Sequence, residues 1–101
     1  MEIIRGTTPT IQFSFETIEP SNIVTAYLII KQDSSVIIEK SISDSSVVED
    51  KLSFTLTQEE TLSLGKSKAY VSLDWVTNGG VRGRSKVVPF TVSDSGKDEV
   101  L

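Results

Sequence analysis

Three cations alternate with small residues in the stretch VTNGGVRGRSKVVPF, which spans residues 76–90. On a β-strand, Arg82, Arg84 and Lys86 would lie on one face and could bind a polyanion or an acidic protein surface. The glycines before them suggest a phosphate-binding loop. However, their order differs from G-x-x-x-x-G-K-[ST], and a strand pattern follows where that loop requires a helix. The stretch therefore predicts a partner-contact surface or a solvated sheet face, and not a nucleotide site.

The composition excludes most catalytic chemistry. The 101 residues include no cysteine and no histidine, so the chain has no thiolate nucleophile, no disulfide and no imidazole base. Two clusters of acids lack the D-x-[DN]-x-[DN]-G spacing of a calcium loop. These clusters are Asp44, Glu49 and Asp50, and Asp94, Asp98 and Glu99. We therefore expect a protein that is not an enzyme and that holds no metal or other cofactor.

The formal net charge of −4 is unevenly distributed along the chain. Residues 1–50 carry three cations against eight acids, whereas residues 51–92 carry six cations against three acids. The acidic balance argues against binding to nucleic acid, and the asymmetry can orient the protein against a partner or another copy of itself. The start lacks a signal-peptide pattern, and the apolar stretch 23–30 is too short to cross a bilayer. We expect synthesis in the bacterial cytoplasm and no membrane attachment.

Alternating apolar and polar residues predict a series of short strands. The alternation is regular over residues 10–16, 52–56 and 68–75. The stretch 23–32 has apolar residues on both faces, which is typical of a central strand, and residues 36–41 are expected to pair with it as a hairpin.

These strands and their turns predict the fold class. Short strands at intervals of roughly ten residues indicate an all-β protein, an antiparallel immunoglobulin-like β-sandwich of about seven strands. Residues 1–93 are expected to form this single domain. The polar segment 94–101 is expected to be a flexible C-terminal tail.

The period changes after the stretch 52–56. The sequence Thr57-Gln-Glu-Glu60 matches the capping box, in which the Thr57 hydroxyl accepts from the Glu60 N–H and the Glu60 side chain reaches back. One short helix is expected near residues 58–64, with Gly65 ending it in the left-handed conformation. The polar run 43–46 is interpreted as a turn.

The register of the last hairpin follows from the side chains that each loop length brings together. A two-residue loop would place both arginines on the apolar face beside Trp75, which costs several kcal/mol when guanidinium groups are buried unpaired. A three-residue loop instead opposes Asp74 to Arg84 and Trp75 to Gly83. It also uses Gly80 where such loops need a left-handed residue. We therefore predict the three-residue loop.

The three-residue loop requires a break in the last strand. It places Val87 opposite Val71 and Lys86 opposite Ser72. The apolar residues that follow have the same parity as the cations, so the alternation must fail. They are Val88, Phe90 and Val92. The break is predicted at residues 87–89, around Pro89.

Three stretches resemble a group of small proteins encoded in phages and prophages of Gram-positive bacteria. They are RGTTPTIQFSF at 5–15, LSFTLTQEETLSL at 52–64 and AYVSLDWVTNGGVRGRSK at 69–86. Such proteins sit among virion structural genes and resemble, more distantly, the N-terminal domain of the phage baseplate upper protein, a β-sandwich that docks onto other tail components. The resemblance covers about 90 residues and implies a non-enzymatic assembly module. It assigns no role to individual residues.

The expected function is that of a phage or prophage structural protein, associated with the tail or baseplate. Its partners would be other virion proteins or copies of itself. The candidate partner-contact face comprises Tyr70, Arg82, Arg84 and Lys86, and a further candidate is the N-terminal edge at Ile3 and Ile4. The alternative is a soluble β-sandwich module that binds a surface glycan or another ligand. For that function Tyr27 and Tyr70 are the aromatic candidates, because Trp75 is expected in the core.

Overall fold

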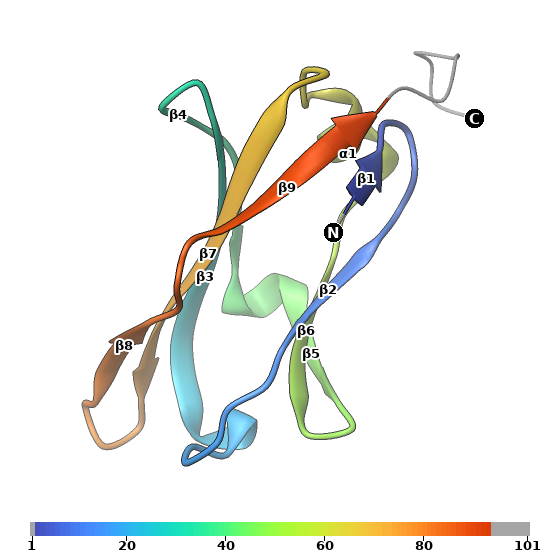
Figure 1. Ribbon diagram of the computed structural model, residues 1–101. Coiled ribbons are helices and arrows are strands. Elements are labelled where there is room, and N and C mark those ends of the chain that lie inside the picture. The colour runs from blue at the N-terminus through green and yellow to red at the C-terminus, as the bar shows by residue number, and fades with distance from the viewer. Residues whose placement is uncertain (1, 94–101) are drawn as a thin grey trace.

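Two β-sheets packed face to face make up the computed structural model, which describes residues 2–93 (Figure 1). The strands are β1 (Glu2–Ile4), β2 (Thr10–Phe13), β3 (Ile23–Gln32), β4 (Ser35–Ser41), β5 (Ser45–Val48), β6 (Lys51–Thr55), β7 (Lys68–Thr77), β8 (Arg82–Arg84) and β9 (Val88–Ser93). The helical segments are α1 (Gln58–Leu62) and the 3-10 turns η1 (Pro20–Asn22) and η2 (Ile42–Asp44). The tail predicted at 94–101 lies outside the described residues.

The order of the strands identifies the fold. The larger sheet, sheet A, runs β1-β9-β7-β3-β4, with β8 also paired to β7, and the smaller sheet B runs β2-β6-β5. In immunoglobulin terms β2-β6-β5 corresponds to strands B-E-D and β3-β7-β9 to C-F-G, with β4 as an added C′ strand. The predicted immunoglobulin-like β-sandwich is therefore confirmed. One pairing differs from a wholly antiparallel arrangement, because β1 pairs with β9 in parallel.

The core lies between the sheets and consists of the inward-facing residues of each strand. In β3 and β7 these are the alternate residues Ala26, Leu28, Ile30, Ala69, Val71 and Leu73. Sheet B contributes Phe54, against which Phe13 packs edge to face with ring centres 6.2 Å apart. Each large buried side chain contributes about 1.5–3 kcal/mol. A core of this kind stabilises the sandwich without the disulfide between strands B and F that many immunoglobulin domains have.

An inward-facing ion pair joins the two sheets beside β4. Nζ of Lys40 donates to the backbone O of Thr55 at 2.9 Å and to Oε1 of Glu60 at 2.9 Å. The same carboxylate accepts from the Thr57 N–H at 2.8 Å, and the Thr57 hydroxyl accepts from the Glu60 N–H at 3.1 Å, which confirms the predicted capping box. Burial acts to raise the pKa of Glu60. The Lys40 and Thr57 hydrogen bonds and the charge of Lys40 outweigh it and hold that pKa below its usual value.

The predicted helix is present, but its end differs from the prediction. α1 ends at Leu62, and Gly65 does not have a positive φ, so the expectation of a left-handed glycine there is wrong. The side chain of Gln32 fastens Gly65 instead. Its Nε2 donates to the Gly65 O at 2.7 Å and its Oε1 accepts from the Gly65 N–H at 2.8 Å, so both backbone groups are satisfied. Among the described residues no helix is long and apolar enough to cross a membrane.

A strand begins within the polar run 43–46, where the sequence indicated a turn. That run forms the end of η2 and the start of β5, so the prediction of a turn is only partly right. β5 pairs with β6 through a tight turn at Glu49 and Asp50, whose φ values of 52° and 61° are those of a two-residue hairpin turn. β5 is an edge strand whose valines stay exposed, so it lacks the apolar alternation that predicts a strand.

The β7–β8 hairpin has the register derived from the sequence. Asp74 pairs with Arg84, and Trp75 pairs with Gly83. Gly80 in the loop has a φ of 82°, which favours glycine. The three-residue loop is therefore confirmed, and it sets both arginines on the outer side of sheet A.

The break in the last strand lies earlier than predicted. Residues 85–87 belong to no strand, whereas Pro89, where the break was expected, lies inside β9. Ser85 accounts for this position. Its N–H donates to the Leu73 O and its hydroxyl accepts from the Leu73 N–H, both at 2.8 Å. The β7–β8 ladder can therefore end there without an unpaired backbone group on Leu73.

Candidate partner-binding face

The outward-facing residues of β3 and β7 form the centre of the exposed face of sheet A, called here the outer face. Side chains alternate along a strand, so the neighbours of the buried core residues point away from sheet B. Tyr27 on β3 pairs with Asp74 on β7. The side chains of Tyr27 and Tyr70 are 43% and 42% exposed. The two tyrosines share the outer face, four positions apart along the strands, which is roughly 13 Å.

Close contact between Gly83 and Trp75 holds β8 against β7. A Cβ on Gly83 would lie 2.3 Å from Cζ2 of Trp75, so no larger residue fits without displacing the indole. The indole packs edge-on against Phe15 with ring centres 5.1 Å apart. Its Nε1 is buried and has no hydrogen-bond partner in the part of the chain described. The expected packing of Trp75 against the core is confirmed, and it positions the arginines on either side of Gly83.

Asp74 and Arg84 form a two-pronged ion pair on the outer face. Nε of Arg84 donates to Oδ1 of Asp74 at 2.7 Å, and Nη2 donates to Oδ2 at 3.3 Å. The hydrogen bonding to this carboxylate, together with its charge, raises the pKa of Arg84 above its usual value. The Arg84 side chain is 74% exposed, so water screens the pair and its contribution to folding is small.

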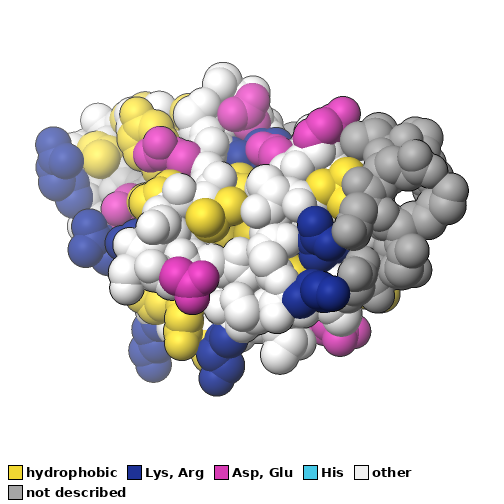
Figure 2. Space-filling view, turned by 90° about the horizontal axis from the view of Figure 1, so that it is seen from above, with side chains coloured by type: hydrophobic (Ala, Val, Ile, Leu, Met, Phe, Trp, Pro, Cys, Tyr) yellow, Lys and Arg dark blue, Asp and Glu magenta, His cyan; other side chains and the backbone are white. Residues whose placement is uncertain are grey.

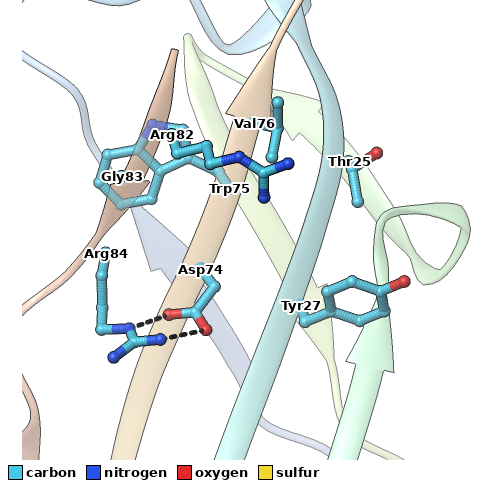
Figure 3. Close-up of a pocket in the computed structure, with 8 residues that line it drawn as sticks. All are labelled: Thr25, Tyr27, Asp74, Trp75, Val76, Arg82, Gly83 and Arg84. Carbon is cyan, nitrogen blue, oxygen red and sulfur yellow. Dashed lines mark hydrogen bonds and ion pairs between the residues drawn. The ribbon is translucent and has the colours of Figure 1, made fainter. Parts of the chain in front are cut away.

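Arg82 differs from Arg84 because it has no ion-pair or hydrogen-bond partner among residues 2–93. It pairs through the backbone with Val76, which in turn pairs with Thr25. Figure 3 shows its guanidinium extended across β7 toward these two residues. A free guanidinium in this position can bind a carboxylate through two parallel hydrogen bonds.

These side chains surround an open hollow of about 520 Å³ on the outer face (Figure 3). Its lining consists of Thr25, Tyr27, Asp74, Trp75, Val76, Arg82, Gly83 and Arg84. Arg82 borders it on one side, the Arg84–Asp74 pair on another, and Tyr27 on a third. The hollow therefore combines an exposed ring, a free cation and an apolar floor, which suits an acidic or aromatic side chain of a partner.

The structure brings together only part of the predicted contact face. Arg82 and Arg84 border the hollow, whereas Tyr70 lies toward the opposite end of β7. Lys86 belongs to the segment 85–87, outside any strand, and Val71 pairs with Val88 rather than Val87. The predicted alternation of three cations is therefore wrong beyond Arg84. The one-residue shift in register removes the strand geometry that the alternation assumed.

The N-terminal candidates Ile3 and Ile4 differ in accessibility. Ile3 is 2% exposed and belongs to the core, so its prediction as a contact residue is wrong, whereas Ile4 is 41% exposed. The alternation of β1 turns one side chain inward and the next outward. Arg5 ties this edge to the chain after α1, because its Nε donates to the Leu64 O at 2.8 Å.

Tyr27 is the residue that the predicted contact face omitted. Its outward position could be read from the alternation of residues 23–32, which turns Tyr27 away from the buried Leu28. Its place beside Arg82 could not be read from that pattern. It depends on the pairing of β3 with β7 and of β7 with β8, which only the assembled sheet establishes.

The end of the sandwich that carries α1 has a different character. Seen from above, cationic and acidic side chains are interspersed there, and hydrophobic side chains occur in separate groups (Figure 2). This view therefore shows no field of a single charge that could steer a partner. The outer face of sheet A remains the stronger candidate.

The fold and the face together define an immunoglobulin-like β-sandwich with an aromatic and cationic outer face. No protein-family model and no curated protein matches the sequence. Among solved structures, the Ig-like domain of mouse leukocyte-associated immunoglobulin-like receptor 1, a strand-swapped dimer, is 17% identical with a TM-score of 0.48, over 91% of this chain and 85% of that chain. Murine CRIg is 10% identical with a TM-score of 0.46, over 93% and 90% of the two chains. The V domain of amphioxus IgVJ-C2 is 16% identical with a TM-score of 0.34, over 92% and 99%.

Proposed function

We propose that this chain is a non-enzymatic structural protein of a bacteriophage or prophage, associated with the tail or baseplate. It acts through protein–protein contacts of the outer face. The hollow beside the β7–β8 hairpin carries the proposal, because Arg82 has no partner there within residues 2–93 and Tyr27 is exposed. Tyrosine and arginine are among the residues that most often dominate the binding energy of protein interfaces.

The sequence resemblance supports the placement in a phage particle. The stretch 69–86 resembles the phage proteins, and in this chain it forms β7 and the hairpin that borders the hollow. Assembly is favoured over catalysis because the chain has neither histidine nor cysteine, the usual general base and a common nucleophile. The chemistry left to the hollow is the binding of a side chain.

A pull-down from a lysate of induced lysogens tests the proposed function. The immobilised wild-type chain is expected to capture tail or baseplate proteins identified by mass spectrometry. The double variant Tyr27→Ala/Arg82→Ala is expected to lose them, because it removes both the ring and the free cation. Lys51→Ala on sheet B is the matched control and should capture as the wild type does. Capture of no virion protein by the wild type, or equal capture by the double variant, would contradict the proposal.

Ligand binding is a second candidate function, favoured by the open shape of the hollow and the exposed ring of Tyr27 at its border. Tyrosine rings can stack on the apolar face of a sugar, and Arg82 can donate to its hydroxyl groups. A screen against cell-wall glycans would show saturable binding that Tyr27→Ala abolishes. Saturable glycan binding without capture of virion proteins would favour this second function over assembly.

A further inference from the structure

Two charged residues at opposite borders of the outer face have no partner. Arg82 on β8 and Glu39 on β4 make no hydrogen bond or ion pair with the residues that the structure describes. Glu39 pairs with Ile29, which shares the outward side of β3 with Tyr27. The carboxylate and the guanidinium therefore lie on the same face, one at each border.

The strand registers give the relative positions of these two charges. Arg82 lies level with Val76 of β7, and Glu39 lies level, through β3, with Ser72 of the same strand. They are separated by three strand spacings across the sheet, roughly 14 Å, and by four positions along it, roughly 13 Å. The midpoint between them falls beside Tyr27, at the hollow.

The uneven charge of the sequence has the same geometry. β3 and β4 come from the acidic half of the chain, residues 1–50, and β7 and β8 come from the basic half, residues 51–92. Sheet A places these halves side by side in the order β8, β7, β3, β4. A partner whose charge runs in the opposite direction would complement both halves at once.

We propose that the partner is a second copy of this chain, docked outer face to outer face about a two-fold axis beside Tyr27. Arg82 of each copy then pairs with Glu39 of the other. A two-fold contact places the first residue against the second and the second against the first, so both free charges are satisfied, each twice per dimer. An unrelated acidic partner would satisfy Arg82 and leave Glu39 unpaired. The inference rests on the proposed function, because it uses the same face.

The centre of this contact is aromatic and apolar. Tyr27 lies beside the axis, and its ring enters the hollow of the other copy between Val76 and the Arg84–Asp74 pair. Ile29 packs next to it. Pairing Arg82 with Glu39 makes the strands of the two copies cross near a right angle, one of the two usual ways in which sheets pack face to face. An apolar centre with charged pairs at the rim is the usual composition of an interface.

Charge reversal tests this inference on the purified full-length chain. The mass in solution is measured by light scattering and sedimentation over a wide range of concentration. The wild type is expected to be a dimer, and Arg82→Glu or Glu39→Arg alone should weaken it by roughly tenfold or more, because each creates two like-charge contacts. The double variant Arg82→Glu/Glu39→Arg should restore the dimer. Lys86→Glu makes the same change of charge outside the hollow and should leave the dimer intact.

The outcomes separate this inference from the proposed function. A wild type that stays monomeric overturns the dimer, and so does a dimer that neither single reversal weakens or that the double variant fails to restore. If the chain is monomeric but its capture of virion proteins still depends on Arg82, the proposed function stands and only the dimer fails. Thermal unfolding of each variant confirms that it is folded, since all these positions are exposed and their substitution should leave the melting temperature unchanged.

Discussion

Sheet A carries two ion pairs that differ in almost every respect. Lys40 and Glu60 meet between the sheets, with side chains 10% and 28% exposed, and Lys40 also binds the Thr55 carbonyl. Arg84 and Asp74 meet on the outer face, with side chains 74% and 32% exposed. The N–O distances are similar, 2.9 and 2.7 Å, so distance alone does not distinguish them.

The difference lies in what each pair would leave behind if it were broken. Loss of Lys40 strands a carboxylate and a carbonyl where water has little access, and the desolvation cost of those groups is then uncompensated. Loss of Arg84 leaves Asp74 in contact with water, which solvates it. The inner pair therefore acts on stability by linking β4 to α1, whereas the outer pair acts on recognition by defining one border of the hollow.

The largest expected effect comes from removing the inner cation. Lys40→Ala should lower the free energy of unfolding by about 3 kcal/mol, because Glu60 and the Thr55 carbonyl lose their partner. Urea denaturation followed by tryptophan fluorescence measures this. Lys31→Ala, an exposed lysine on β3, is the control and should change stability little. Replacing both charges, as Lys40→Met with Glu60→Gln, should recover most of the loss; a double variant as unstable as Lys40→Ala would contradict this account.

The next effect concerns packing at the hairpin. Gly83→Ala should lower the free energy of unfolding by about 2 kcal/mol, because the added Cβ overlaps the ring of Trp75. Tryptophan fluorescence should change as well, since the indole must move. Gly79→Ala in the same hairpin is the matched control, because its Cβ meets nothing closer than 3.9 Å. Equal stability of the two variants would show that the ion pair, and not the Trp75–Gly83 contact, holds β8.

Acid should weaken the inner pair more than the outer one. The pKa of Glu60 is lowered in the folded chain from its ordinary value of 4.5, so its ionised form stabilises the fold above about that pH. This stability is lost as the pH falls through the folded pKa. Melting temperatures measured down through that range should decline less steeply in Glu60→Gln than in the wild type. Glu59→Gln, exposed on the same helix, should follow the wild type; if it also flattens the decline, Glu60 is not the cause.

The smallest effect is expected at the outer pair. Asp74→Asn should leave the melting temperature within experimental error of the wild type, because the pair is solvated and screened. The same variant should alter the binding of a partner by freeing Arg84 to move. A marked loss of stability would mean that the two ion pairs are more alike than their exposure indicates.

The parts predicted from the sequence are those that local patterns encode. The capping box at Thr57 and Glu60, the alternation of β3 and β7, and the three-residue loop at Gly80 each depend on neighbours within one element or one hairpin. The start of β5 within the polar run and the early break at Ser85 were missed. β5 carries no alternation, and the break is placed by a hydrogen bond to Leu73 on another strand.

The candidate face shows the same division. Arg82 and Arg84 were placed on the outer side by register alone, since a buried guanidinium is too costly. The sequence by itself determined the fold class, the outward cations and the glycine beneath which Trp75 packs. Only the tertiary structure decided that Tyr27 joins Arg82 at one hollow, that Glu39 lies at the opposite border and that Lys40 turns inward to Glu60. Alternation specifies the side of a strand, whereas the neighbours of a side chain depend on which strands pair and in what register.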